Sequence, residues 1–184
     1  MKRVLVVVDM QKDFVDGALG TPEAQAIVGN VCEKVSKFDG DILVTLDTHQ
    51  ENYLETQEGK KLPVVHCVYN TEGWEINDEV AYALDCKFYT CNSRIEPFMK
   101  PTFGSVEMVE YLLEKEKEEH IDEIVLVGLC TDICVVSNAL LLKANFLDTN
   151  IVVDASCCAG VTPETHEAAL ATMKMCQIEV IGNA

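Results

Sequence analysis

Basic residues are scarce in this chain of 184 residues. Lysine and arginine together number 14, against 31 aspartates and glutamates, and the formal net charge is −17. A surface with that charge repels phosphate groups over most of its area. The composition therefore argues against a nucleic-acid partner and against binding to an anionic membrane surface.

Long hydrophobic runs are also missing. The apolar run in MKRVLVVVDMQKDF is interrupted by Asp9, which leaves it too short for a signal peptide or a membrane-spanning helix. We therefore expect a cytoplasmic protein. The chain also lacks a linker, a repeat or a low-complexity tract. With 48% hydrophobic residues it is long enough for one sizeable core, so we expect a single domain over residues 1–184.

The nine cysteines are an odd number and have no accompanying targeting segment. We expect reduced thiols, most of them packed as small apolar groups. One stretch raises a further possibility. In VGLCTDICVVSNAL, Cys130 and Cys134 lie four residues apart, where an apolar run gives way to a helical pattern.

Runs of β-branched residues alternate with helical periods along the chain. The pattern predicts strands at residues 3–8, 41–46, 123–127, 150–153 and 178–181, and helices at residues 24–38, 105–119, 131–145 and 163–175. Ser105 and Thr162 are the expected helix caps, and Val106, Val109, Leu112 and Leu113 the expected buried face of one helix. Residues 50–99 read as long loops with one short strand near residues 87–90. This alternation predicts an α/β fold in which helices cover both faces of a mainly parallel sheet, a three-layer αβα arrangement.

Ligands of such sheets bind beyond the carboxyl ends of the strands. Asp9 and Asp47 each end a predicted strand, and the CTDIC segment follows a third. We expect these three positions to meet at one edge of the sheet.

Cys134 lies near the start of its predicted helix, where backbone N–H groups and the helix dipole stabilise a thiolate. Those N–H groups could also receive the oxyanion formed by attack on a carbonyl. Lys100, in FMKPTFGS, could lower the pKa of the thiol, and Asp9 could take its proton. Packing for the cysteine, a solvated lysine and an aspartate that caps a turn remain the alternatives.

Asp47, His49 and His66 form a second group of interest. In LDTH the aspartate and histidine are two residues apart, so an extended backbone points both to one side. One carboxylate and two imidazoles suit zinc, manganese or iron. The alternative is a carboxylate bonded to a structural histidine. The other two histidines, His120 and His166, lie in polar helical stretches and are predicted to be on the surface.

Three segments carry a family resemblance. DMQKDF at residues 9–14, KPTFGS at 100–105 and GLCTDICV at 128–135 resemble the three signatures of the isochorismatase-like cysteine hydrolases, in the same order and strand context. The resemblance covers most of the chain. It implies a doubly wound αβα fold and a catalytic triad of Asp9, Lys100 and Cys134, with Cys134 as the nucleophile.

The DTH…H pattern resembles the nicotinamidase branch of that family, in which a divalent metal holds the pyridine nitrogen of nicotinamide. This implies Asp47, His49 and His66 as metal ligands. A further histidine is missing between them, and EGKKLPVVH resembles the variant that uses a glutamate. We therefore expect Glu58 as the additional ligand, with Glu55 as second choice. Zinc is the expected ion, with manganese and iron as alternatives.

The resemblance also implies a cis peptide between Leu129 and Cys130, with the backbone N–H groups of Cys130 and Cys134 forming an oxyanion hole. Relatives more often carry alanine where Cys130 stands. Its thiol is left either to packing or to a regulatory disulfide with Cys134. Phe14, by resemblance, and Trp74, as a second aromatic, are expected to line the pocket for the substrate ring.

The implied function is hydrolysis of nicotinamide to nicotinate and ammonia through a cysteine thioester, in NAD salvage, by an enzyme expected to be a homo-oligomer. Pyrazinamide should also be accepted. One alternative is a metal-independent cysteine hydrolase of the same family that acts on another small amide or carbamoyl compound. Another is a non-enzymatic thiol redox or metal-binding protein that uses Cys130, Cys134 and the pair Cys157 and Cys158.

Overall fold

A single parallel sheet organises the chain. The computed structural model describes residues 1–91 and 94–182. The sheet order is β3-β2-β1-β4-β5-β6, and every neighbouring pair is parallel. The strands are β1 (Arg3–Val8), β2 (Asp41–Asp47), β3 (Ile95–Lys100), β4 (Glu123–Leu129), β5 (Asn150–Ala159) and β6 (Glu179–Ile181). The order reverses between β1 and β4, so the fold is doubly wound.

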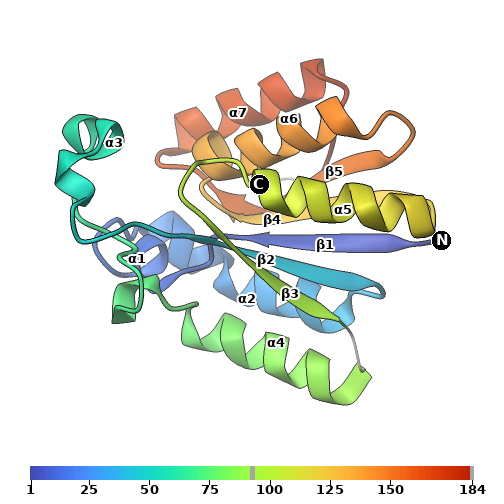
Figure 1. Cartoon of the computed structure of the whole chain (residues 1–184), viewed down its shortest axis with the longest axis horizontal. Coiled ribbons are helices and arrows are strands. Elements are labelled where there is room, and N and C mark those ends of the chain that lie inside the picture. Colours follow the sequence, from blue (N-terminus) through green and yellow to red (C-terminus); the bar gives the residue numbers. More distant parts are fainter. Residues whose placement is uncertain (92–93, 183–184) are drawn as a thin grey trace.

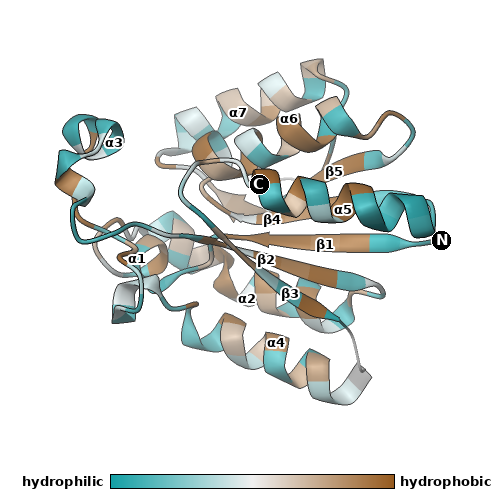
Figure 2. Cartoon of the chain, in the orientation of Figure 1, coloured by the Kyte–Doolittle hydropathy of each residue, from teal (hydrophilic) through white to brown (hydrophobic). Residues whose placement is uncertain are grey.

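Helices cover both faces of the sheet (Figure 1). One face carries α1 (Lys12–Val15), α2 (Pro22–Lys37) and α4 (Asp78–Cys91), and the other carries α5 (Val106–Glu118), α6 (Val136–Asn145) and α7 (Pro163–Met175). Figure 2 shows hydrophobic strands enclosed between the two helical layers. This confirms the predicted three-layer αβα fold. Within the described ranges, no helix combines the length and the apolar character needed to cross a membrane.

Short helical turns occupy the segments near the carboxyl edge of the sheet. They are the 3₁₀ turns η1 (Tyr53–Glu55) and η2 (Glu72–Trp74), the short helix α3 (Gln57–Lys61), and the π-helical turn η3 (Thr131–Val135) that leads into α6. Figure 1 shows α3 standing beyond the end of the sheet.

Both predicted helix caps are confirmed. Ser105 Oγ accepts a hydrogen bond from the backbone N–H of Met108 at 3.2 Å, and Thr162 forms a capping box with Thr165 at the start of α7. The predicted buried face of α5 is wrong at its first residue. Val106 is 59% exposed because it lies away from the buried face of α5, which is formed by Met108, Val109 and Leu112.

The expected strand near residues 87–90 is also wrong, because these residues end α4. Val80, Ala83, Leu84 and Lys87 are buried at helical spacing, which is the period of an amphipathic helix. The strand of this region lies later, in β3, at the edge of the sheet. The edge position tolerates Pro97, which lacks an N–H for a further strand.

The backbones of β1 and β4 approach each other closely at the point where the strand order reverses. Gly128 on β4 has φ +114°, and a Cβ there would lie 2.1 Å from the carbonyl oxygen of Val8. Only glycine fits such an approach. It brings the segment after β4 beside the end of β1, where Asp9 follows.

Candidate active site

Three buried side chains meet at the carboxyl edge of the sheet. Lys100 Nζ, at the end of β3, lies 2.7 Å from Oδ2 of Asp9, which follows β1. The same ammonium donates a hydrogen bond to Sγ of Cys134 in η3 at 3.4 Å. Their exposed fractions are 1% for Lys100, 0% for Asp9 and 4% for Cys134. The structure therefore brings together the three residues that the sequence singled out.

Burial has the largest effect on the pKa of the Cys134 thiol. Burial raises the pKa of the Cys134 thiol well above its usual value, the charge of Asp9 raises it further, and Lys100 offsets only part of this. Lys100 does lower the thiol pKa, as expected, but burial outweighs its contribution. Burial alone would lower the pKa of Lys100, but the negative charge of Asp9 outweighs it and the pKa is raised. The raised pKa values favour a protonated thiol beside a charged lysine.

Two buried polar side chains that sequence reasoning missed hold the aspartates. Thr45 Oγ1, on β2, donates a hydrogen bond to Asp9 Oδ1 at 2.6 Å. Gln11 brackets Asp47, because its Oε1 accepts from the Asp47 N–H at 2.7 Å and its Nε2 donates to the Asp47 carbonyl at 2.9 Å. The available signal was a polar residue inside an apolar strand for Thr45 and the position within DMQKDF for Gln11.

Next to this group lies a cluster of possible metal ligands. Asp47 Oδ2 is 3.0 Å from His49 Nε2 and 3.5 Å from His66 Nε2. One ligand atom from each of these three buried residues lies within 4.8 Å of the others. Glu58 Oε1, on α3, is 3.5 Å from His49 Nε2. In the part of the chain that the structure describes, His49 Nε2 is buried and, although both carboxylates lie close to it, it makes no well-aligned hydrogen bond. A divalent cation would satisfy that nitrogen, so the donor set fits a metal.

The surroundings of the histidines are built to hold them. His66 Nδ1 lies 2.8 Å from the carbonyl oxygen of Val64. A proton on Nδ1 satisfies that contact and leaves Nε2 free to bind a metal, the usual outer-sphere arrangement. Tyr53, fully buried, packs its ring 4.5 Å from the ring of His49 and 5.0 Å from that of His66. Sequence reasoning assigned no such role to Tyr53, which lies in the irregular segment.

Asp47 is ionised in this setting. Burial opposes its charge, but the imidazoles of His49 and His66 and the charge of Lys100 hold its pKa below the usual value. His66 shows the reciprocal effect, since burial would lower its pKa but contact with Asp47 raises it. The cluster thus keeps one carboxylate negative beside two nitrogens, which favours cation binding.

A cavity of about 320 Å³ opens onto both groups. Its walls are mostly apolar, and its lining also includes Cys130 and Cys134 as well as Asp47, Glu58 and His66. Its apolar lining includes Phe14, Leu19, Leu62, Phe103, Ile133 and Val161. This cavity volume is at the low end of the range for ligand-binding pockets, so the cavity suits a small molecule.

Trp74 stands elsewhere. Its Nε1 donates to Thr48 Oγ1 at 2.9 Å and its ring packs edge-on against Tyr69 at 5.2 Å. It does not line the cavity that Phe14 lines. The expectation that Trp74 contacts the substrate ring is therefore corrected. η2 turns the indole toward Thr48 and Tyr69, away from the cavity.

His166 is also misplaced by the sequence-based prediction. It is only 7% exposed, whereas His120 is exposed as expected. His166 Nδ1 lies 2.8 Å from Thr131 Oγ1 in the turn that carries Cys134. Gly160 permits the close packing, because a Cβ there would lie 2.9 Å from His166 Cβ. The polar sequence around His166 hid this contact.

The cysteines in this region are unpaired. The expected cis peptide between Leu129 and Cys130 is confirmed. Cys130 and Cys134 are both free thiols, as are the other six cysteines whose side chains the structure describes. Burial, together with the charge of Asp132, raises the pKa of Cys130 to about 12.

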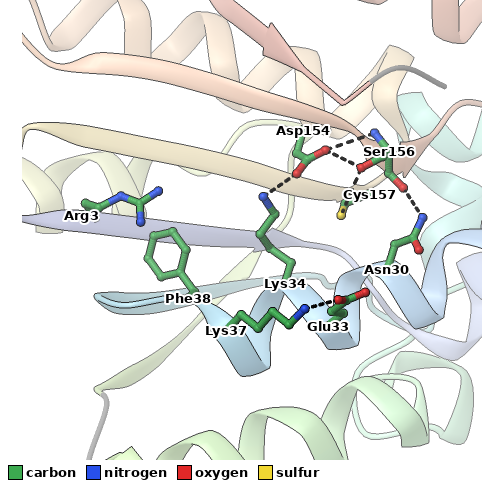
Figure 3. Close-up of a pocket in the computed structure, with 9 residues that line it drawn as sticks. All are labelled: Arg3, Asn30, Glu33, Lys34, Lys37, Phe38, Asp154, Ser156 and Cys157. Atoms are coloured by element: carbon green, nitrogen blue, oxygen red, sulfur yellow. Dashed lines mark hydrogen bonds and ion pairs between the residues drawn. The ribbon is translucent and has the colours of Figure 1, made fainter.

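A second hollow, of about 510 Å³, lies between α2 and β5 (Figure 3). Its charged side chains form three ion pairs, Lys34 with Asp154, Lys37 with Glu33, and Arg3 with Glu123. Ser156 Oγ also donates to Asp154 at 2.6 Å. Because its charges neutralise one another, we assign it no chemistry.

Comparison with known proteins agrees with this geometry. The family pattern of the isochorismatase domain matches residues 3–184. A nicotinamidase/pyrazinamidase of Mycobacterium tuberculosis is 27% identical over 97% of this chain and 98% of its own length. The structure of a nicotinamidase/pyrazinamidase from Bacillus subtilis superposes with a TM-score of 0.83 at 26% identity, over 98% of this chain and 100% of its own. A pyrazinamidase of Pyrococcus horikoshii, solved in complex with zinc, gives a TM-score of 0.76 at 26% identity over all of both chains.

Proposed function

The chain belongs to the isochorismatase family of hydrolases, and from that premise we propose that it hydrolyses nicotinamide to nicotinate and ammonia. The observation that carries the proposal is the buried contact of Lys100 with Asp9 and with Cys134, because Cys134 lines a small cavity that Asp47 and His66 also line. The first three residues can cleave an amide, and the last two can orient an aromatic nitrogen. Such an activity would return nicotinamide to NAD salvage.

In the proposed first step, Cys134 attacks the carboxamide carbon while Asp9 takes the proton from Sγ. The raised thiol pKa makes this proton transfer part of the attack, so the base must be in place. Lys100 balances the negative charge that develops on sulfur. The backbone N–H groups of Cys130 and Cys134 would hold the oxyanion.

The second step returns the proton. Asp9 donates it to the departing ammonia, which leaves a thioester on Cys134. Asp9 then takes a proton from water as the water attacks the thioester carbon. Nicotinate leaves and Cys134 regains its proton, so the cycle closes without a net change in the protein.

A divalent metal, zinc in this proposal, would be held by Asp47, His49 and His66, with Glu58 as the additional ligand. When bound it supplies an electrophilic anchor for the pyridine nitrogen. Glu58 is preferred to Glu55 because its carboxylate lies 3.5 Å from His49 Nε2. The zinc complex of the P. horikoshii relative supports the choice of ion. Phe14, whose ring lies 5.4 Å from that of His66, would contact the substrate ring from the side.

The test is ammonia release by the purified protein from nicotinamide, pyrazinamide and benzamide. Benzamide is the matched control because it lacks the ring nitrogen. We expect turnover of the first two, weak turnover of benzamide, loss of activity after chelation and its return with zinc. Cys134→Ala serves as the blank, and Cys176→Ala, at an exposed position, as the matched cysteine control. A metal-replete, reduced protein that releases no ammonia from nicotinamide would overturn the proposal.

A further inference from the structure

We propose that Thr45 is a positioning residue for this reaction, and that it aims the Asp9 carboxylate at Lys100 and Cys134. The inference rests on the proposed function, because it assigns to Asp9 the transfer of a proton. It concerns a residue outside the three sequence signatures, on strand β2 between β3 and β1.

Thr45 contacts Asp9 twice. Its Oγ1 donates to Asp9 Oδ1 at 2.6 Å, and its carbonyl oxygen accepts from the Asp9 N–H at 3.2 Å. Both residues are fully buried. Asp9 itself has φ +47°, a left-handed conformation that non-glycine residues adopt rarely and that its surroundings must hold. Thr45 therefore holds both the backbone and the side chain of an unusually placed residue.

The hydroxyl determines which oxygen of Asp9 faces the chemistry. With Oδ1 engaged by Thr45, Oδ2 is the oxygen that lies 2.7 Å from Lys100 Nζ. A carboxylate held at only one oxygen can rotate about its Cβ–Cγ bond, since that torsion is soft. Holding the second oxygen removes this freedom.

Lys100 makes this restraint matter. Its ammonium lies 2.7 Å from Asp9 but also 3.6 Å from Asp47 Oδ1, so two carboxylates compete for one cation. If Asp9 turned away, the ammonium would shift toward Asp47 and leave Cys134. Thr45 thus keeps the lysine and the base together beside the thiol.

Packing alone does not explain a threonine here. Its neighbours on β2 and β1 are apolar, and valine has nearly the same shape and an equal preference for strands. A buried hydroxyl costs free energy unless it is hydrogen-bonded. Among the described residues, the bond to Asp9 is the one hydrogen bond that this hydroxyl makes, which points to a role in holding that carboxylate.

The experiment compares Thr45→Val and Thr45→Ser in the metal-replete enzyme. Thr149→Val is the matched control, because Thr149 is a buried threonine just before β5, at the opposite end of the sheet. For Thr45→Val we expect kcat to fall about 10-fold to 100-fold, the cost of a small misplacement of a reacting group. KM should stay within about twofold, and metal content should be unchanged. Thr45→Ser, which keeps the donor, should recover most of kcat.

A kcat for Thr45→Val within about twofold of wild type would overturn the proposal, and so would a serine variant as impaired as the valine variant. A second measurement separates this inference from the proposed function. The rate at which iodoacetamide alkylates Cys134, followed on its peptide by mass spectrometry, needs no substrate. If wild type releases no ammonia from nicotinamide, the function fails. A slower alkylation in Thr45→Val, restored in Thr45→Ser, would still support the role of Thr45, and equal rates would refute it.

Discussion

Asp47 and Lys100 are register partners on the neighbouring strands β2 and β3, and Oδ1 of the aspartate lies 3.6 Å from Nζ of the lysine. The other oxygen of Asp47 faces His49 and His66. One carboxylate therefore borders both the nucleophile group and the metal-ligand cluster. A substitution in the nucleophile group should therefore change metal binding, and one in the metal-ligand cluster should change the reactivity of the thiol. Metal content and thiol reactivity have to be measured together.

Removing the charge of Lys100 should disturb both the nucleophile group and the metal-ligand cluster. In Lys100→Met, two buried carboxylates lose their shared cation, and breaking such a pair costs about 3–5 kcal/mol. We expect activity to fall by at least about 10³-fold and the free energy of unfolding in urea to fall as well. Lys87→Met is the matched control, since Lys87 is buried and its Nζ, among the described residues, forms no ion pair and donates to the backbone carbonyl of Ser36 at 3.4 Å. Equal losses in the two variants would contradict the special role of Lys100.

Glu58 and Glu55 can be separated directly. Glu58 lines the cavity near His49, whereas Glu55 is exposed three residues earlier. We expect Glu58→Gln to weaken zinc binding by about tenfold or more, as the loss of an anionic group near the ion should, and Glu55→Gln to leave it unchanged. Competition with a chromophoric chelator measures both affinities. Weaker binding in the Glu55 variant alone would reverse the assignment.

Acid should destabilise the metal-free protein partly through Asp47. Its folded-state pKa lies below the ordinary 3.8, so its ionised form stabilises the native state at pH above that value. This contribution is lost as the pH falls toward the folded-state pKa. Between neutral pH and about pH 3, wild type should lose more free energy of unfolding than Asp47→Asn, both with chelator present. Parallel losses would show that Asp47 is not held ionised by its neighbours.

The sequence predicted β1, β2, β4, β5 and β6, because buried parallel strands are continuous apolar runs, and it placed Asp9 and Asp47 at the ends of the first two. It missed β3, the strand that ends at Lys100. It failed where burial depends on packing between distant segments. α4 was missed because exposed Tyr82 and Tyr89 blur its buried face.

The roles of Thr45, Gln11 and Tyr53 could not be predicted for a related reason. Each acts on a residue from another strand or turn, and sequence spacing does not show which side chains face one another across strands. His166 was missed because its polar neighbours suggest a surface helix. Its burial depends on close packing against Gly160, a contact that sequence spacing does not show.

The protonation state of Cys134 gives the most direct test of the mechanism. Burial and the charge of Asp9 raise its pKa, so the resting group at neutral pH is a thiol. As the pH rises toward that pKa the thiolate fraction grows, and the rate of alkylation by iodoacetamide should rise with it. Cys176, which is exposed, serves in the same digest as the control for reagent activity. In Lys100→Met, Cys134 should be alkylated more slowly than in wild type at the same pH, because the positive charge that partly offsets its raised pKa is gone. A fast rate that does not change with pH around neutrality would show a preformed thiolate instead. Asp9 would then not be needed as the proton acceptor during attack, and its role would be confined to the later proton transfers to ammonia and from water.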